Sequence, residues 1–240
     1  MPAMRFLTSL LFFFAILAPA ADIRIGIIGT DTSHVIAFSK ILNDPKHPDH
    51  IPGARIVAAY KGGSKDIESS STRVDKYAEE LARDWKVEIV PDIATLLTKV
   101  DAVLLESVDG RLHLAQAKPV IAAGKPLFID KPLASTLEDA VEIAKLAKAK
   151  NVKWFSSSSL RWAKSLGPLA QPGLKGAVVW GPGPPEEHHY LELGWYAIHA
   201  SEMLFTLMGK GCQTVTRMYS ADQDEISCRW SDGRIGTVRA

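Results

Sequence analysis

Short apolar runs and helical stretches alternate without a break between residues 23 and 156, and this alternation limits the fold more than any other feature of the chain. The apolar runs are typical of strands, because strands buried on both faces of a sheet are apolar throughout. They are Ile23–Gly29, Ala54–Tyr60, Val87–Val90, Asp101–Ser107, Pro126–Ile129 and Val152–Ser156. Strands separated by helices predict an α/β fold, a doubly wound parallel sheet with helices on both faces.

The first strand runs into Gly29 and then into a turn of helix-capping residues, Thr30–Ser33. A first strand followed by a glycine turn and a helix is the phosphate-binding position of Rossmann-type sheets, and ligands of such sheets bind at the carboxyl ends of the strands. The segments expected to line this crevice are Gly29–Ser33, Tyr60–Ser64, Ser107–Gly110 and Asp130–Pro132.

The pattern changes after about Ser157, which predicts a Rossmann domain over residues 22–156 and an α+β domain over residues 157–240. The second part holds a strand at Ala177–Trp180, a helix from Gly194 to Met208, and short alternating strands. The segment Arg234–Ala240 has the pattern of a strand with no closing element after it. An apolar strand edge without a partner is an aggregation hazard, so the second domain is expected to be incomplete.

The chain has two cysteines, Cys212 and Cys228. The flanking residues predict a hairpin in which Thr214–Ser220 pairs with Glu225–Ser231. In that register the two cysteines do not lie opposite each other, so the prediction is a pair of free thiols.

Residues 1–21 are not expected to belong to the fold. A basic start, Met1–Arg5, precedes the apolar run Phe6–Ala18 and a small-residue cleavage site at Ala18–Ala20. This pattern is typical of a secretory signal peptide and the run is short for a membrane span, although an uncleaved anchor is the alternative. The mature chain is therefore expected to be exported, periplasmic or extracellular, and free of the membrane after cleavage.

Charge is nearly balanced, with 28 lysine and arginine residues against 27 aspartate and glutamate residues. No strongly basic face is implied, and this argues against nucleic acid as a partner. A small molecule is the expected partner, and whether the chain forms a homo-oligomer stays open.

Three segments carry specific motifs: the opening IRIGIIGTDTSH, the block Asp101–Ala134, and the segment Gly194–Gly209. Together they resemble the oxidoreductases of the Gfo/Idh/MocA (glucose–fructose oxidoreductase / inositol dehydrogenase) family. The central block is the most specific, because family members there run from an apolar strand through a histidine and a helix to an Ala-Gly-Lys and a Glu-Lys-Pro strand end. The spacing from His113 to Lys131 matches that pattern without a gap.

The resemblance implies a Rossmann domain whose NADP or NAD cofactor is covered by the second domain. By position, Lys131 would contact the nicotinamide ribose and the substrate hydroxyl, His199 would be the partner acid/base, and Arg161 would lie near the carboxamide. Hydride transfer from an alcohol needs a group that takes the hydroxyl proton; histidine suits this task at neutral pH, whereas a lysine needs a lowered pKa. The residues expected to contact the cofactor are Gly29, Thr30, Thr32, Ser33, Lys61, Ser64, Ser107, Asp109, Asp130, Lys131 and Arg161.

The phosphate turn departs from the usual G-x-G-x-x-G, because one glycine remains and Asp31 lies in the turn. A carboxylate about 4 Å from a phosphate charge costs roughly 1 kcal/mol in water and about 4 kcal/mol at a protein-like dielectric constant. Either Asp31 points away and caps the helix, leaving Thr32 and Ser33 to donate to phosphate, or dinucleotide binding is weakened. The acidic residue expected after the second strand is replaced by Lys61–Ser64, which favours NADP over NAD.

Two other clusters have simpler interpretations. Glu186–His189 has the composition of a metal site, but adjacent residues on a strand point to opposite faces, and no metal ligands are assigned. The serines of Ser156–Ser159 lack the Gly-x-Ser-x-Gly elbow of a nucleophile. His34 follows the capping residues of the first helix and is interpreted as structural, with contact to phosphate as the alternative.

The leading hypothesis is an NAD(P)-dependent oxidoreductase that transfers a hydride between the cofactor and a sugar-like or cyclitol alcohol or ketone. The alternative is a non-catalytic, extracytoplasmic ligand-binding module on the same fold. The matches at Lys131 and His199 favour the enzyme, whereas the lost glycines and export to a compartment with little free cofactor favour the binding module.

Overall fold

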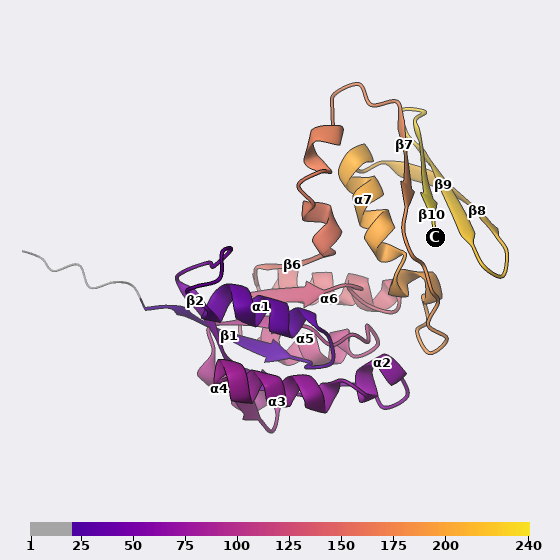
Figure 1. Cartoon of the computed structure of the whole chain (residues 1–240). Coiled ribbons are helices and arrows are strands. Elements are labelled where there is room, and N and C mark those ends of the chain that lie inside the picture. The colour runs from indigo at the N-terminus through magenta and orange to yellow at the C-terminus, as the bar shows by residue number, and fades with distance from the viewer. Residues whose placement is uncertain (1–20) are drawn as a thin grey trace, which may run out of the picture.

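The computed structural model describes residues 21–240, and its first part is a six-stranded parallel sheet with the strand order β3-β2-β1-β4-β5-β6 (Figure 1). This is the Rossmann order. The strands are β1 (Ile23–Ile28), β2 (Ala54–Tyr60), β3 (Glu88–Val90), β4 (Ala102–Leu105), β5 (Leu127–Asp130) and β6 (Trp154–Ser157). Each overlaps one predicted apolar run, so the predicted doubly wound α/β fold is confirmed. Residues 1–20, on which the signal-peptide prediction rests, lie outside the described residues.

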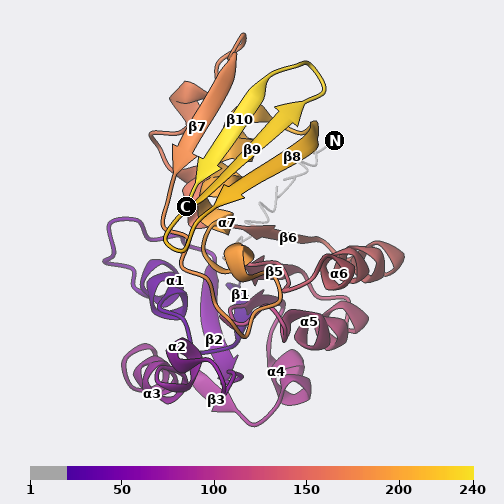
Figure 2. The ribbon, with the colours of Figure 1, turned by 90° about the vertical axis from the view of Figure 1, so that its right-hand side faces the viewer.

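Helices cover both faces of this sheet (Figure 2). Neighbouring residues of a strand reach opposite faces: Ile27 packs in one hydrophobic cluster with helices α1 and α3, and Ile28 packs in the other with α4, α5 and α6. The helices are α1 (His34–Asn43), α2 (Glu68–Ser71), α3 (Val74–Trp85), α4 (Ile93–Lys99), α5 (His113–Ala122) and α6 (Leu137–Ala149). In the described part of the chain, no helix has the length and apolar character needed to cross a membrane.

The second part of the chain is a four-stranded mixed sheet of order β7-β10-β9-β8, with one helix packed on it. Its elements are β7 (Gly176–Trp180), α7 (Ile198–Met208), β8 (Cys212–Tyr219), β9 (Asp224–Trp230) and β10 (Ile235–Arg239). Leu204 and Met208 of α7 share a hydrophobic cluster with Trp230 and Val238 of the sheet. The α+β prediction is therefore confirmed, with α7 beginning later than predicted because a 3₁₀ turn precedes it.

The last strand, β10, is not an edge of this sheet. It pairs in parallel with β7 on one side and antiparallel with β9 on the other. The prediction of an unprotected apolar strand at Arg234–Ala240 is therefore wrong, because neighbours on both sides supply the backbone hydrogen bonds. The edges are β7 and β8, and strand order in space cannot be read from strand order in the chain.

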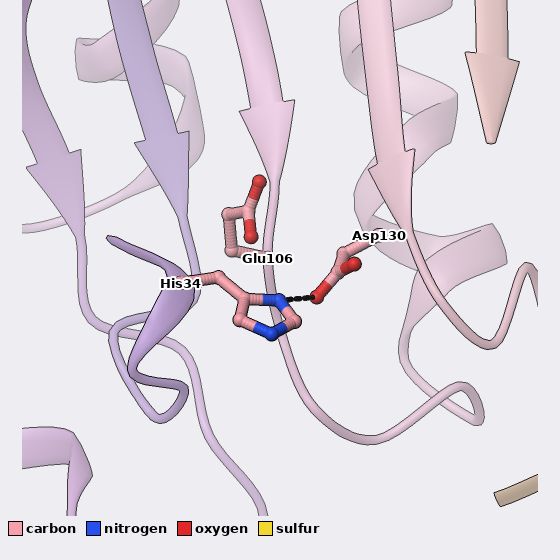
Figure 3. A group of neighbouring side chains, drawn as sticks. All are labelled: His34, Glu106 and Asp130. Carbon is pink, nitrogen blue, oxygen red and sulfur yellow. Dashed lines mark hydrogen bonds and ion pairs between the residues drawn. The ribbon is translucent and has the colours of Figure 1, made fainter. Parts of the chain in front are cut away.

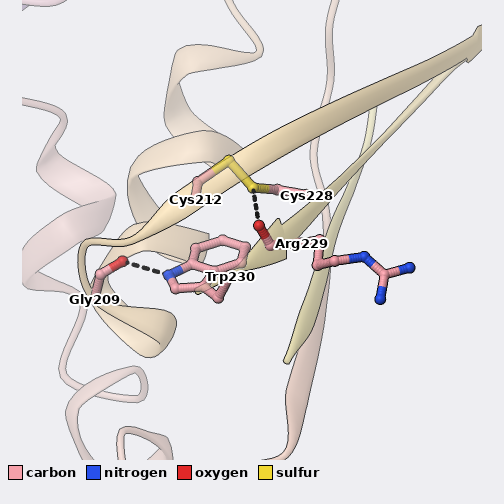
Figure 4. The surroundings of a disulfide bond; sticks show 5 residues. All are labelled: Gly209, Cys212, Cys228, Arg229 and Trp230. Carbon is pink, nitrogen blue, oxygen red and sulfur yellow. Dashed lines mark hydrogen bonds between the residues drawn. A yellow bond between two sulfur atoms is a disulfide. The ribbon is translucent and has the colours of Figure 1, made fainter. Parts of the chain in front are cut away.

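Cys212 and Cys228 form a disulfide bond between β8 and β9 (Figure 4), which contradicts the prediction of free thiols. The predicted hairpin does form, and in its ladder Cys228 lies opposite Val215 while Cys212 lies opposite Trp230. The ladder has a register shift between Cys212 and Thr214, and the two cysteine Cα atoms lie 5.8 Å apart. This distance is within the range that a disulfide spans, so the two cysteines pair across the hairpin although they do not lie directly opposite each other.

Candidate active site

A cluster of titratable side chains lies at the carboxyl ends of β1, β4 and β5, the edge at which Rossmann sheets bind ligands. His34 begins α1, Glu106 follows β4, and Asp130 ends β5 (Figure 3). His34 Nδ1 lies 2.6 Å from Asp130 Oδ2. Lys131 follows Asp130 in the chain. His199 of α7 lies close enough to Lys131, Asp130 and His34 to interact with them electrostatically. We call these five residues the strand-edge cluster.

Glu106 is the most buried member of the strand-edge cluster. Its side chain has no exposed surface, and neither carboxylate oxygen has a hydrogen-bond partner among residues 21–240. Burial, and then repulsion from Asp130 and Asp31, raise the pKa of Glu106 well above its usual value, while Lys131 opposes the shift. None of the sequence motifs described above includes this residue as a site residue. The available signal is an acidic residue at the end of an otherwise apolar run, because fully buried carboxylates are rare without a partner.

Lys131 is almost completely buried, with 9% of its surface exposed. Its ammonium group faces two aromatic rings, 5.4 Å from the centroid of Tyr196 and 6.0 Å from that of Trp195. Burial lowers the pKa of Lys131, against the opposing charges of Asp130 and Glu106. The lysine therefore has the kind of environment that an acid/base lysine requires, and its catalytic role remains a prediction.

His199 is held by a neighbouring hydroxyl group. Its Nδ1 atom lies 2.6 Å from Ser158 Oγ, and its ring packs against the ring of Tyr196 with 5.1 Å between centroids. Burial, and then the charge of Lys131, lower the pKa of His199 to about 4. The imidazole is therefore neutral near pH 7, and Nε2 is the nitrogen left to exchange a proton. Ser158 belongs to the serine run that the sequence suggests is a polar strand end.

Arg161, which the family resemblance places near the carboxamide, is held by an ion pair with α7. It lies on a 3₁₀ turn (η1, Ser159–Trp162) after β6, and its Nε donates to Glu202 Oε2 of α7 over 2.5 Å. This ion pair and the Ser158–His199 hydrogen bond connect the end of the first sheet to α7. Lys131 and His199 therefore lie close to each other, and Arg161 connects the end of the first sheet to α7 beside them.

The predicted phosphate-binding turn is closed by contacts within the protein. Gly29 has a φ of 90°, and a Cβ atom there would lie 2.3 Å from the backbone nitrogen of Ser107, so glycine is required. Thr30 donates its backbone N–H to Lys61 O over 2.7 Å and its hydroxyl to Val74 O over 2.8 Å. These three predicted cofactor-binding residues (Gly29, Thr30 and Ser107) are buried.

The carboxylate of Asp31 is also fully buried in this turn. It accepts hydrogen bonds from the backbone N–H of Val108 over 3.1 Å and from the Ser70 hydroxyl over 2.6 Å. Burial raises the pKa of Asp31, although the two hydrogen bonds oppose the shift. Asp31 does not cap α1, whose N-cap residue Ser33 has no side-chain cap bond, so the capping alternative is wrong. Thr32 is buried, and Ser33 is exposed.

The segment after β2 folds over the same turn. The Ser64 hydroxyl donates to the buried carboxylate of Asp109. Arg111 pairs with Asp109 and with Asp66, at 2.8 Å in each case. Two residues predicted to hold the cofactor, Ser64 and Asp109, are therefore satisfied by each other and by Arg111.

Other buried polar atoms along this edge have no partner among residues 21–240: Ser107 Oγ, Gln116 Oε1, Ser135 Oγ, His189 Nε2 and both oxygens of Glu106. Ser107 and Gln116 adjoin Gly62, while Ser135 and His189 adjoin Gly110. Buried polar groups normally have partners, so these unpartnered atoms would supply hydrogen bonds to a polar ligand such as a nicotinamide riboside bound at this edge. The turn itself fits a pyrophosphate only if Asp31 separates from Ser70 and Val108.

The Glu186–His189 stretch does not converge on one point. His188 pairs with Glu186 at 2.8 Å on the surface. His189 is buried, and its ring packs against that of Trp195 with 5.6 Å between centroids. The two adjacent histidines therefore lie in different environments.

Comparisons with known proteins agree with this architecture. Residues 23–158 match the model of a family described as "Oxidoreductase family, NAD-binding Rossmann fold". Inositol 2-dehydrogenase of Agrobacterium fabrum is 32% identical over 135 residues, which cover 54% of this chain and 35% of that protein. The matches to curated relatives span only about a third of those proteins, 28% and 35%.

Solved structures share the fold at low sequence identity. UDP-N-acetylglucosamine 3-dehydrogenase GnnA from Acidithiobacillus ferrooxidans superposes with a TM-score of 0.70 at 17% identity, covering 92% of this chain and 70% of that one. The WlbA dehydrogenase from Chromobacterium violaceum, solved with NADH and UDP-GlcNAcA, gives a TM-score of 0.66 at 17% identity and covers 92% and 68%. At these identities the likeness establishes the fold alone. The family match covers more than half of the chain and includes the turn, Glu106 and Lys131, and on this ground the chain belongs to the Gfo/Idh/MocA oxidoreductase family and carries its NAD-binding Rossmann fold.

Proposed function

We propose that this protein is an NAD(P)-dependent oxidoreductase that transfers a hydride between the cofactor and a sugar-like or cyclitol alcohol or ketone. The observation that carries the proposal is the meeting of Lys131, from the end of β5, with His199, from α7, at the carboxyl edge of the Rossmann sheet. Family membership and the named activities of relatives, an inositol dehydrogenase among them, support the same reaction class.

The cluster offers the proton chemistry that such a reaction needs. When bound, the cofactor supplies the hydride acceptor or donor. In the direction of alcohol oxidation, the hydroxyl proton leaves to a protein group as the carbon loses its hydride. Neutral His199, held by Ser158, can take that proton on Nε2. Lys131 can donate a hydrogen bond to the same substrate oxygen, because its ammonium group has no hydrogen-bond or ion-pair partner among residues 21–240.

The test is single-turnover hydride transfer in Lys131→Ala, His199→Ala and the double variant. Each single substitution should lower the rate by about 100-fold or more, as expected for positioned acid/base groups. The double variant should lose little more than the worse single variant, because groups that act as a unit are non-additive. Lys131→Ala should also weaken cofactor binding, while His199→Ala should not. Near-wild-type turnover in His199→Ala would remove His199 from the mechanism.

The exposed Lys145 of α6 and His47 of the α1–β2 loop provide matched controls. Neither belongs to the strand-edge cluster, so Lys145→Ala and His47→Ala should leave turnover unchanged. A loss of turnover of similar size in these controls would show that the effect comes from a general change in the fold and not from the site.

The closed phosphate turn favours a second candidate, a ligand-binding module that uses the same edge without a dinucleotide. Titration of NAD⁺ and NADP⁺, followed by tryptophan fluorescence, separates the two. The oxidoreductase should bind NADP⁺ more tightly, because half-exposed Lys61 follows β2 and could contact a 2′-phosphate. Its ammonium group pairs with the surface carboxylate of Asp75, 2.8 Å away. Lys61→Ala should reduce the preference for NADP⁺ over NAD⁺. Asp31→Asn should lower the Kd of both cofactors about tenfold, because it removes a buried negative charge near the phosphate turn. Folded protein that binds neither cofactor, even as Asp31→Asn, would leave the binding module as the function.

A further inference from the structure

Three members of the strand-edge cluster have the chemistry of metal ligands. One ligand atom from each of His34, Glu106 and Asp130 can be chosen so that all three lie within 4.8 Å of one another (Figure 3). The side chains come from α1 and from the ends of β4 and β5, elements fixed by the core of the sheet. One imidazole and two carboxylates form a ligand set that Zn²⁺ and related divalent ions accept.

Glu106 is a second, independent indication of a missing positive partner. Its side chain is 0% exposed, and both of its oxygens are without a hydrogen bond in the described part of the chain. Lys131 is the neighbouring cation, but within residues 21–240 its ammonium group contacts the rings of Tyr196 and Trp195 and forms no ion pair. An unpaired buried carboxylate is unfavourable, so either a proton or a bound cation must neutralise it.

We propose that His34, Glu106 and Asp130 bind a divalent transition-metal ion of the Zn²⁺ type. Ligand atoms of a tetrahedral zinc ion lie about 3.3 Å apart, because each bond is about 2.0–2.1 Å long. The His34–Asp130 distance of 2.6 Å would therefore open slightly, and Glu106 would approach by rotation of its side chain. Two carboxylates and a neutral imidazole balance the charge of the ion.

Three protein ligands leave a fourth position for water or a ligand oxygen, as in catalytic rather than structural zinc sites. Lys131 interacts electrostatically with Glu106, and His199 interacts with Asp130 and His34, so both side chains lie next to the three ligands. The ion would orient and polarise a hydroxyl or carbonyl oxygen of a sugar-like molecule. This site goes beyond the proposed oxidoreductase activity and does not depend on it, since binding of the ion requires no dinucleotide.

The test is titration of the chelator-treated chain with Zn²⁺ alone, and with Mn²⁺ as a second probe, by calorimetry and metal analysis. The wild-type chain should take up one Zn²⁺. Glu106→Gln and His34→Ala should each weaken this binding at least tenfold. His188→Ala is the matched control, because His188 lies on the surface beside Glu186 and Glu187 and could bind zinc adventitiously; it should leave the site unchanged. No uptake by the wild type, or uptake abolished by His188→Ala, would overturn the proposal.

Thermal unfolding checks that the variants fold and gives a second readout. Glu106→Gln keeps the shape of the side chain and removes a buried charge, and His34 is partly exposed, with 34% of its side chain accessible, so both metal-free variants should fold. Zn²⁺ should raise the Tm of the wild type and of His188→Ala, because a ligand of the native state stabilises it. The same rise in both cluster variants would overturn the site. A chain that binds Zn²⁺ but no dinucleotide would refute the oxidoreductase proposal alone.

Discussion

At the scale of single residues, surroundings decide what a titratable group can do. His199 lies between Ser158, Tyr196 and Lys131 and is held neutral near pH 7. Burial shifts the pKa in the opposite direction for Glu106 and Asp31: it raises the pKa of both carboxyl groups, because their neutral form is the protonated one. None of these environments depends on neighbours in the sequence alone. The sequence prediction names His199 as a candidate acid/base, which remains a prediction, and it does not name Glu106.

The lowered pKa of His199 predicts a pH-dependent stability. The folded pKa is about 4, and an unfolded histidine titrates near 6.5. Between these values the unfolded chain binds more protons, so the stability contributed by neutral His199 is present above about pH 6.5 and is lost as pH falls toward 4. Urea unfolding at pH 7 and pH 5 should show a free-energy loss about 1–2 kcal/mol larger in the wild type than in His199→Gln.

His47→Gln is the control for that measurement, because His47 is half-buried in the α1–β2 loop and does not belong to the strand-edge cluster. Its loss of stability between pH 7 and pH 5 should match that of the wild type. Equal losses in the wild type and in His199→Gln would mean that the imidazole is already solvated in the folded chain.

At the scale of elements, irregular positions carry more information than regular ones. The bulge in β8 lies next to Cys212, which is bonded to Cys228. The turn η1 and its N-cap residue Ser158 contact α7 through the Ser158–His199 hydrogen bond and the Arg161–Glu202 ion pair. Period-2 and period-3.6 patterns locate strands and helices, but such patterns contain no signal for a single inserted residue. The bulge in β8 and the contacts of the turn η1 with α7 are therefore visible only in the folded structure.

The disulfide should stabilise the second sheet. It closes a loop with a sequence separation of 16, and a loop of that size restricts the unfolded chain by about 3 kcal/mol. The double variant Cys212→Ser/Cys228→Ser should lose about 2–4 kcal/mol in denaturant unfolding, and addition of a reductant should affect the wild type but not this variant. An unchanged midpoint in reduced wild type would show that the packing of Trp230 and α7 alone sets the stability of this sheet.

At the scale of the whole molecule, two sheets meet through one helix. Figure 1 shows α7 between the carboxyl edge of the first sheet and the strands of the second. The Ser158–His199 hydrogen bond and the Arg161–Glu202 ion pair cross this junction. A site completed by both parts can respond to their relative position, which is why we assign the chemistry to the strand-edge cluster and not to either part alone.

Export is a proposal about the whole molecule that rests on residues 1–21. The basic start, the apolar run and the small-residue site predict cleavage within a residue or two of Ala21. N-terminal sequencing of the protein recovered from the extracytoplasmic fraction should begin there. A chain that keeps the run Phe6–Ala18 would indicate an uncleaved anchor instead.

The sequence by itself determined the layered α/β fold and the family, because alternating apolar runs and a continuous motif are local properties of the chain. It also names Lys131 and His199 as candidate acid/base residues, which remains a prediction. Only the tertiary structure decided the closed turn at Asp31, the disulfide, the internal place of β10 and the burial of Glu106. Each of these depends on atoms far apart in the chain that packing brings within a few ångströms. The free energies of these features depend on burial and on charge interactions in a low-dielectric interior. That interior does not exist until the chain has folded.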